Sequence, residues 1–201
     1  IISTLILSLL VLSPAFAVDF YKHTIDAAMT NATWATSADI DGDGDIDIVA
    51  SSSLVGSDNG IVWYENNGAE VFTDHPLSDT YNLVQSLTVG DIDSDGDLDV
   101  IASGNEASDL VWFENDGTPA TGYWAENEII ETWFYGTGMH VLDMDRDGDN
   151  DVLACISNSN DIVWFKNDGS ESFELTYIVE NGFSGPWDTF PRRCCDRKIC
   201  G

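Results

Sequence analysis

Short segments with apolar and polar residues in alternation recur through the middle of the chain, and they predict β-strands. The segment 98–103 alternates with a period of two, and polar turns such as 115–117 follow neighbouring segments of the same kind. Around this segment we expect four strands, at 87–90, 98–103, 110–114 and 124–131. No helical periodicity is long enough to compete, so the pattern predicts an all-β fold.

The same unit occurs three times, at steps of about 52 residues, which indicates a repeat architecture. Four short strands in a meander form one blade of a β-propeller. The sequence therefore predicts a propeller of four-stranded antiparallel blades, with about three blades present and the ring incomplete. The propeller region spans 18–190, with repeats near 34–79, 87–131 and 139–180. Strands in the outer repeats are expected at 34–38, 46–51, 61–65, 72–77, 139–142, 151–155, 162–166 and 173–179.

One tryptophan occupies the same position in every repeat: Trp63, Trp112 and Trp164. We interpret it as packing between neighbouring sheets rather than as a platform for a ligand, because a large aromatic residue needed once per blade fits a structural role. Cys155, the only cysteine in the body of the chain, is expected to be a buried apolar residue.

Residues 20–23 lie about 52 positions before 72–75 and resemble them, which predicts an outermost strand ahead of the first complete blade. Such a strand would be an exposed edge unless it completed the last blade of a closed ring.

The chain carries 36 acidic and 7 basic residues, a formal net charge of −29. This balance argues against nucleic acid and anionic membranes as partners, because binding to phosphate needs Lys and Arg. With 43% hydrophobic residues the chain is nevertheless too apolar to be a disordered acidic tail. The negative charge instead predicts that the protein binds cations.

Much of the charge is concentrated in three nine-residue loops of the form Asp-x-Asp-x-Asp-Gly-x-x-Asp, each with a further Asp at position 7. Carboxylates at positions 1, 3, 5 and 9, with the backbone carbonyl of position 7, offer the hard oxygen ligands that Ca²⁺ prefers, and the glycine allows the tight turn. We therefore expect about three Ca²⁺ ions, one in each loop. The predicted ligands are Asp39, Asp41, Asp43, Asp45, Asp47, Asp91, Asp93, Asp95, Asp97, Asp99, Asp143, Asp145, Asp147, Asp149 and Asp151, of which Asp45, Asp97 and Asp149 act through their carbonyls.

Two alternatives compete with this interpretation of the loops. An EF-hand would need a bidentate Glu at position 12, where the chain has Ala50, Ala102 and Ala154, and its flanks would be helices. Acidic turns without metal are the other alternative, but packing five carboxylates into nine residues is costly unless a cation offsets their repulsion. Metal binding should accordingly be coupled to folding.

The acidic loop between two strands, followed by Val-Trp-aromatic-Glu-Asn, resembles the FG-GAP and VCBS repeats of integrin-α-like β-propellers over about residues 20–180. Literal Phe-Gly and Gly-Ala-Pro segments are not evident, which favours the VCBS-like branch. The resemblance implies a ring of typically seven blades, structural Ca²⁺ in the loops, and a secreted or surface-attached module for cell adhesion or for binding proteins or glycans.

The termini differ in composition from the middle. Residues 1–17 have the apolar core and the small-x-small ending of a signal peptide that begins truncated, with cleavage after Ala17. This predicts a protein that is secreted or at the cell surface, with no insertion in a membrane after cleavage. Residues 191–201 form an atypical tail rich in Cys and Arg, whose composition favours an artefact of a partial gene over a native disulfide knot.

A secreted polysaccharide-active enzyme, a lyase or a hydrolase using a propeller face, is the second class of function. No Ser-His-Asp, Cys-His or zinc spacing is visible, so we assign no catalytic residue and favour a non-catalytic module. Of the three histidines, His23 and His75 are equivalent by repeat, which leaves His140 as the one without a counterpart.

Overall fold

The computed structural model describes residues 22–52, 60–78, 81, 83–104, 109–122, 124–130, 136–157 and 159–179. These residues form strands and no helix, which confirms the all-β prediction. None of them belongs to a helix that is long and apolar enough to cross a membrane. The strands are β1 (Ala32–Ala38), β2 (Asp47–Ser52), β3 (Ile61–Asn66), β4 (Phe72–Ser78), β5 (Val84–Gly90), β6 (Asp99–Gly104), β7 (Leu110–Glu114), β8 (Ala125–Ile130), β9 (Gly136–Leu142), β10 (Asp151–Ile156), β11 (Asp161–Asn167) and β12 (Phe173–Val179).

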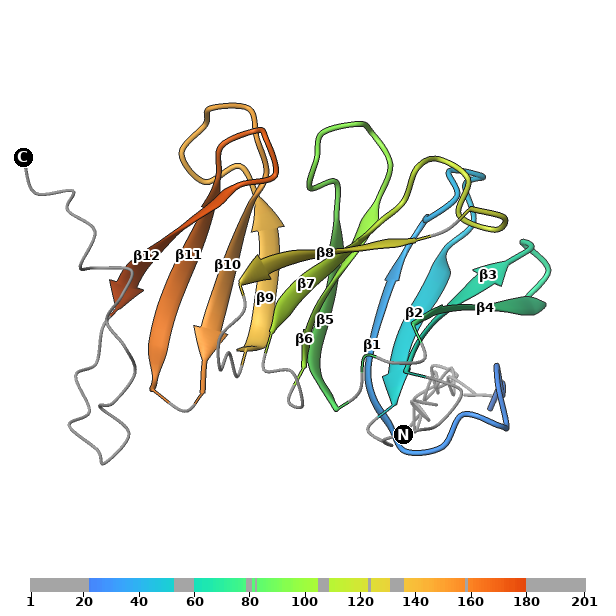
Figure 1. The fold of residues 1–201 in the computed structure, drawn as a ribbon. Helices are drawn as coiled ribbons and strands as arrows, with labels where there is room; N and C mark the ends of the chain where they lie inside the picture. Colours follow the sequence, from blue (N-terminus) through green and yellow to red (C-terminus); the bar gives the residue numbers. More distant parts are fainter. Residues whose placement is uncertain are drawn as a thin grey trace, which may run out of the picture.

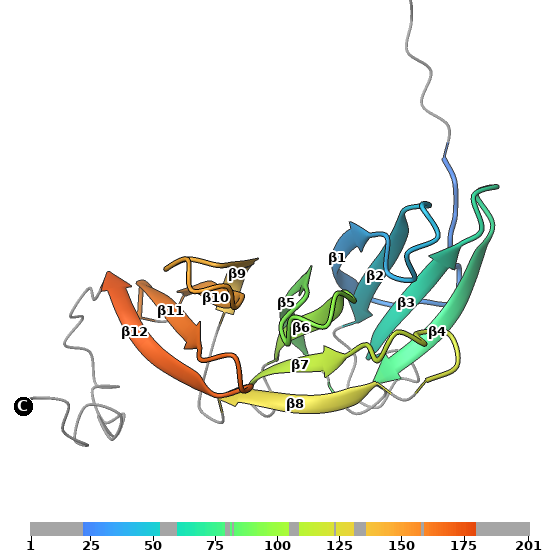
Figure 2. The same cartoon turned by 90° about the horizontal axis from the view of Figure 1, so that it is seen from above.

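The strands form three four-stranded antiparallel meanders, which we call the first blade (β1–β4), the second blade (β5–β8) and the third blade (β9–β12). The blades stand side by side in sequence order (Figure 1). Seen from above they fan out, with β1, β5 and β9 gathered on one side and β4, β8 and β12 on the other (Figure 2). The first strands of neighbouring blades are in contact, β1 with β5 and β5 with β9. The fan does not close into a ring, so the predicted partial propeller is confirmed.

Each acidic loop connects the first two strands of a blade, because its last aspartate opens the second strand of the ladder. Asp47 pairs with Ala38 in the first blade, and Asp99 pairs with Gly90 in the second. In the third blade Asp151 pairs with Leu142. All three loops are therefore held by a hairpin in the same register, at equivalent corners of their blades.

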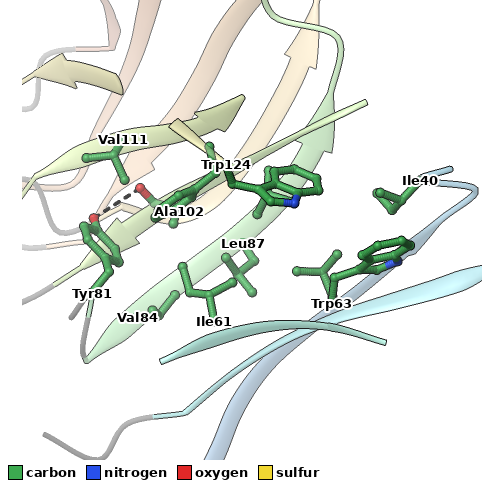
Figure 3. Close-up of a cluster of buried hydrophobic side chains, with 12 residues drawn as sticks. Ile40, Ile61, Trp63, Tyr81, Val84, Leu87, Ala102, Val111 and Trp124 are labelled. Atoms are coloured by element: carbon green, nitrogen blue, oxygen red, sulfur yellow. Dashed lines mark hydrogen bonds between the residues drawn. The ribbon is translucent and has the colours of Figure 1, made fainter. Parts of the chain in front are cut away.

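The hydrophobic core lies between the blades, so the two central strands of the middle blade, β6 and β7, bury both faces. Along β6, Val100 and Ala102 face the first blade, whereas Ile101 belongs to the cluster shared with the third. Figure 3 shows Ile61 and Trp63 of the first blade facing residues of the second. Trp63 and Trp112 are 0% and 1% exposed, which confirms their predicted role in packing between sheets.

The third blade has one face that no other blade covers in the described part of the chain. On β10, Val152 and Ala154 belong to the core shared with the second blade. Cys155 alternates to the opposite face and is exposed. The prediction that Cys155 is buried is wrong, because burial at this position depends on a neighbouring blade. Trp164 is likewise only partly buried.

The strand predicted at 20–23 is not formed by its two described residues, Lys22 and His23, and the other two lie outside the described residues. The following segment crosses the free face of the first blade instead of pairing along a strand edge. Met29 packs against the cluster that contains Tyr64, whose hydroxyl donates to Asp26 at 2.9 Å. The predicted signal peptide, 1–17, and the tail, 191–201, also lie outside the described residues.

Candidate metal centre

Each acidic loop brings three carboxylates together, with one oxygen of each side chain lying within 4.8 Å of the others. Loop 1 is residues 39–47, loop 2 is residues 91–99 and loop 3 is residues 143–151. The converging residues are Asp39, Asp41 and Asp43 in loop 1, Asp91, Asp93 and Asp99 in loop 2, and Asp143, Asp145 and Asp151 in loop 3.

The backbone of each loop turns back on itself at two positions. The glycines at position 6 adopt the left-handed conformation, with φ of 98°, 101° and 105°. Their amides donate to the first aspartate of the loop, as from Gly44 to Asp39 Oδ2 at 3.1 Å. Position 4 is also left-handed, and the sequence did not predict this, because Gly42, Ser94 and Arg146 share no side-chain chemistry there.

The aspartate at position 9 is fully buried and fastens the loop to the blade. Asp99 accepts hydrogen bonds from the amides of Ile92 at 2.8 Å and of Asn115 at 2.9 Å, one on each oxygen. Asp47 and Asp151 make the same pair of bonds. Burial raises the pKa of Asp99 to about 7, although the two amide hydrogen bonds act in the opposite direction. This carboxylate ties the start of the loop to the end of the third strand in addition to its predicted role as a ligand.

The aspartate at position 7 turns its side chain away from the converging carboxylates. A Cβ atom added at Gly117 would lie 2.8 Å from Asp97 Oδ2. A Cβ atom added at Gly68 or at Gly169 would likewise come too close to the carboxylate of Asp45 or of Asp149. These carboxylates therefore lie against the turn that follows the third strand. Such a position fits the prediction that they contribute their backbone carbonyls.

Two carboxylate oxygens at the centre of the loops have no hydrogen-bond partner. Asp39 Oδ1 and Asp91 Oδ1 are both buried and accept no hydrogen bond. A buried carboxylate oxygen without a partner is destabilising by a few kcal/mol, on the order of 1–3. A cation bound among these hard oxygens would compensate the cost of burying the unpartnered carboxylate oxygens, so the residues present fit Ca²⁺.

A glutamate that was not predicted stands beside each of the first two loops. Burial raises the pKa of Asp41 and of Asp93, and repulsion from Glu65 and Glu114 respectively adds to this rise. Both glutamates are oriented by a partner on the fourth strand, Glu65 by His75 at 2.7 Å and Glu114 by Asn127 at 3.2 Å. The signal that could have found them is the glutamate's fixed position after the repeated tryptophan.

An asparagine that was also not predicted joins the loops of neighbouring blades. The Nδ2 of Asn115 donates to Leu98 O of its own loop and to Ile40 O of the loop before it, at 3.3 and 3.2 Å. Asn167 does the same one blade later, reaching Ile92 O at 2.8 Å. The loops are therefore parts of the contact between blades as well as candidate metal sites.

Three fanned meanders with an acidic loop in the first hairpin of each define the class: a segment of a repeat β-propeller. The family model for the FG-GAP-like repeat matches residues 39–102 and 93–154, which together are more than half of the chain. The chain belongs to the FG-GAP-like repeat family.

Among solved structures, the chain is similar to a lectin from Agrocybe aegerita described in terms of specific recognition of non-reducing terminal N-acetylglucosamine. The two are 16% identical with a TM-score of 0.44, over 74% of this chain and 52% of the lectin. The chain thus spans about half the length of that structure. No curated protein sequence matches it.

Proposed function

We propose that this chain is part of a secreted or cell-surface β-propeller that binds Ca²⁺ in its acidic loops and serves as a module for adhesion or for binding proteins or glycans. The observation that carries the calcium part is the pair of buried, unpartnered oxygens of Asp39 and Asp91 at the centre of two such loops. Membership of the FG-GAP-like family supports the binding part. The apolar segment ahead of Ala17 supports the location.

In this proposal the ion supplies positive charge where the carboxylates converge, and the protein supplies the fixed frame. The amides of the loop orient the first aspartate, and the buried aspartate at position 9 fastens the loop to the third strand. Because the frame recurs in every blade, ions bound there would act as structural clips, and a partner would bind at exposed surface elsewhere, since the faces between neighbouring blades are filled by the core.

No observation on the described residues favours the polysaccharide-active enzyme. His140 is exposed and pairs with Leu153 in the ladder of β9 and β10. His75 on β4 lies 2.7 Å from Glu65, whereas His23 is in no strand and lies 3.4 Å from Glu70, so the two histidines expected to be equivalent have different surroundings.

The test is to probe arrays of glycans and of extracellular proteins with the full chain in millimolar Ca²⁺ and again in excess EGTA. Retention on at least one class of ligand is expected in Ca²⁺, with a loss in EGTA of about tenfold or more, because the loops hold the blades in place. The double variant D39N/D91N is the matched control and should behave in Ca²⁺ as the parent does in EGTA. No retention, together with turnover of a polysaccharide on the array, would contradict the proposal.

A further inference from the structure

Loop 3 differs from the other two in the residues that surround its carboxylates. After the repeated tryptophan and the next aromatic residue, the first two blades have Glu65 and Glu114, whereas the third has Lys166. At position 4 of the loop, Arg146 replaces an uncharged residue. The exchange of Glu for Lys alone changes the formal charge at the site by two units, and Arg146 adds a third.

The side chain of Lys166 reaches into the acidic loop. Its Nζ forms ion pairs with the carboxylates of Asp145 and Asp147, the second at 2.9 Å. Asp145 is one of the three residues that converge in loop 3.

The first aspartate of loop 3 is also satisfied without an ion. Asp143 Oδ1 accepts hydrogen bonds from the amides of Arg146 at 2.6 Å and of Asp147 at 3.1 Å. The equivalent oxygens of Asp39 and Asp91 are buried and accept none. Two independent features thus separate loop 3 from the other two loops: a cation supplied by the chain itself, and amide donors to the oxygen of the first aspartate that has no partner in loops 1 and 2.

We infer that the Lys166 ammonium takes the place of a Ca²⁺ ion in loop 3, so that the chain has two tight calcium sites and a third that is weak. To bind there, an ion must displace the ammonium from Asp145 and Asp147 and enter a site with a smaller negative charge, and ligand charge is a main determinant of calcium affinity. We expect affinity at loop 3 to be lower by on the order of tenfold or more. The inference rests on the proposed function, since it assumes that loops 1 and 2 bind Ca²⁺.

The experiment is calorimetric titration of the full, calcium-stripped chain with CaCl₂. The parent should show two tight sites and one weaker site. K166E, which restores the residue type of the other blades, should give three sites of similar affinity, and E114K should leave one tight site. K166M removes the ammonium without adding a carboxylate, and it should strengthen the third site by less than K166E does.

Lys22 provides the control for net charge, because it is exposed and K22E changes the total charge as K166E does. K22E should leave the titration unchanged, and circular dichroism in Ca²⁺ should show that each variant keeps its β-structure. Three equal sites in the parent, unaltered by K166E and by K166M, would overturn the inference and leave the proposed function standing. No binding of Ca²⁺ by the parent would overturn both.

Discussion

At the scale of single residues, polar side chains fasten each loop to two blades at once. Asn115 is 1% exposed and uses one amide group to hold its own loop and the loop of the preceding blade. Asn66, its equivalent in the first blade, is partly exposed and donates to Ile46 O of its own loop at 3.0 Å. Comparing variants of Asn115 and Asn66 therefore separates the contribution of the hydrogen bond between blades from that of the bond within one blade.

We expect N115A to lower the free energy of unfolding by about 1–3 kcal/mol, because it removes the donor from the buried carbonyl of Ile40 and from the partly buried carbonyl of Leu98. N66A should cost less, since water can replace a bond that is partly exposed. Urea unfolding of both variants in saturating Ca²⁺ measures the difference. Equal losses would show that the bond to Ile40 O contributes nothing measurable.

At the scale of the strands, short apolar segments separated by polar turns predicted all three blades. A strand that lies between two blades is apolar on both faces, so its segment stands out from the turns around it. The boundaries shift by a few residues where loop chemistry intervenes: β2 begins at Asp47 rather than at Ile46, which is 56% exposed. Of the strand predicted at 20–23, the described residues Lys22 and His23 form none, because likeness to β4 carries no information about the partner that a strand needs.

Those features of the candidate site that depend on local residue spacing could be predicted from the sequence. The carboxylates that converge are among the predicted ligands, since positions 1, 3, 5 and 9 of a tight loop face one point. The bond from Asn115 to Ile40 O joins residues 75 positions apart, and no local pattern predicts it. The contact of Lys166 with loop 3 was missed for the same reason, because it becomes visible only when the third strand lies beside the loop.

At the scale of the whole molecule, the blades stabilise one another, and the same residue type contributes differently to stability in different blades. Trp112 is 1% exposed between the second and third blades. Trp164 occupies the equivalent place on the face of the third blade that no described residue of another blade covers, and it is partly buried. Repeat equivalence predicts the position of both, but the neighbouring blade decides their burial.

We therefore expect W112A to destabilise the chain by about 3–5 kcal/mol, as removal of a fully buried aromatic side chain does. W164A should cost less, because part of the side chain is already in contact with water. Chemical denaturation followed by circular dichroism compares the two variants. If W164A were as destabilising as W112A, the open face of the third blade would have to be covered in solution.

The central claim is that calcium in the acidic loops holds the blades together, and the melting curve of the full chain tests it most directly. In millimolar Ca²⁺ the chain should melt at a temperature higher by about 10 °C or more than in excess EGTA, since an ion bound only by the folded state adds its binding free energy to stability. Mg²⁺ at the same concentration should restore little of the difference, because it prefers octahedral sites that keep several waters. Melting curves that coincide in Ca²⁺ and in EGTA would contradict the account.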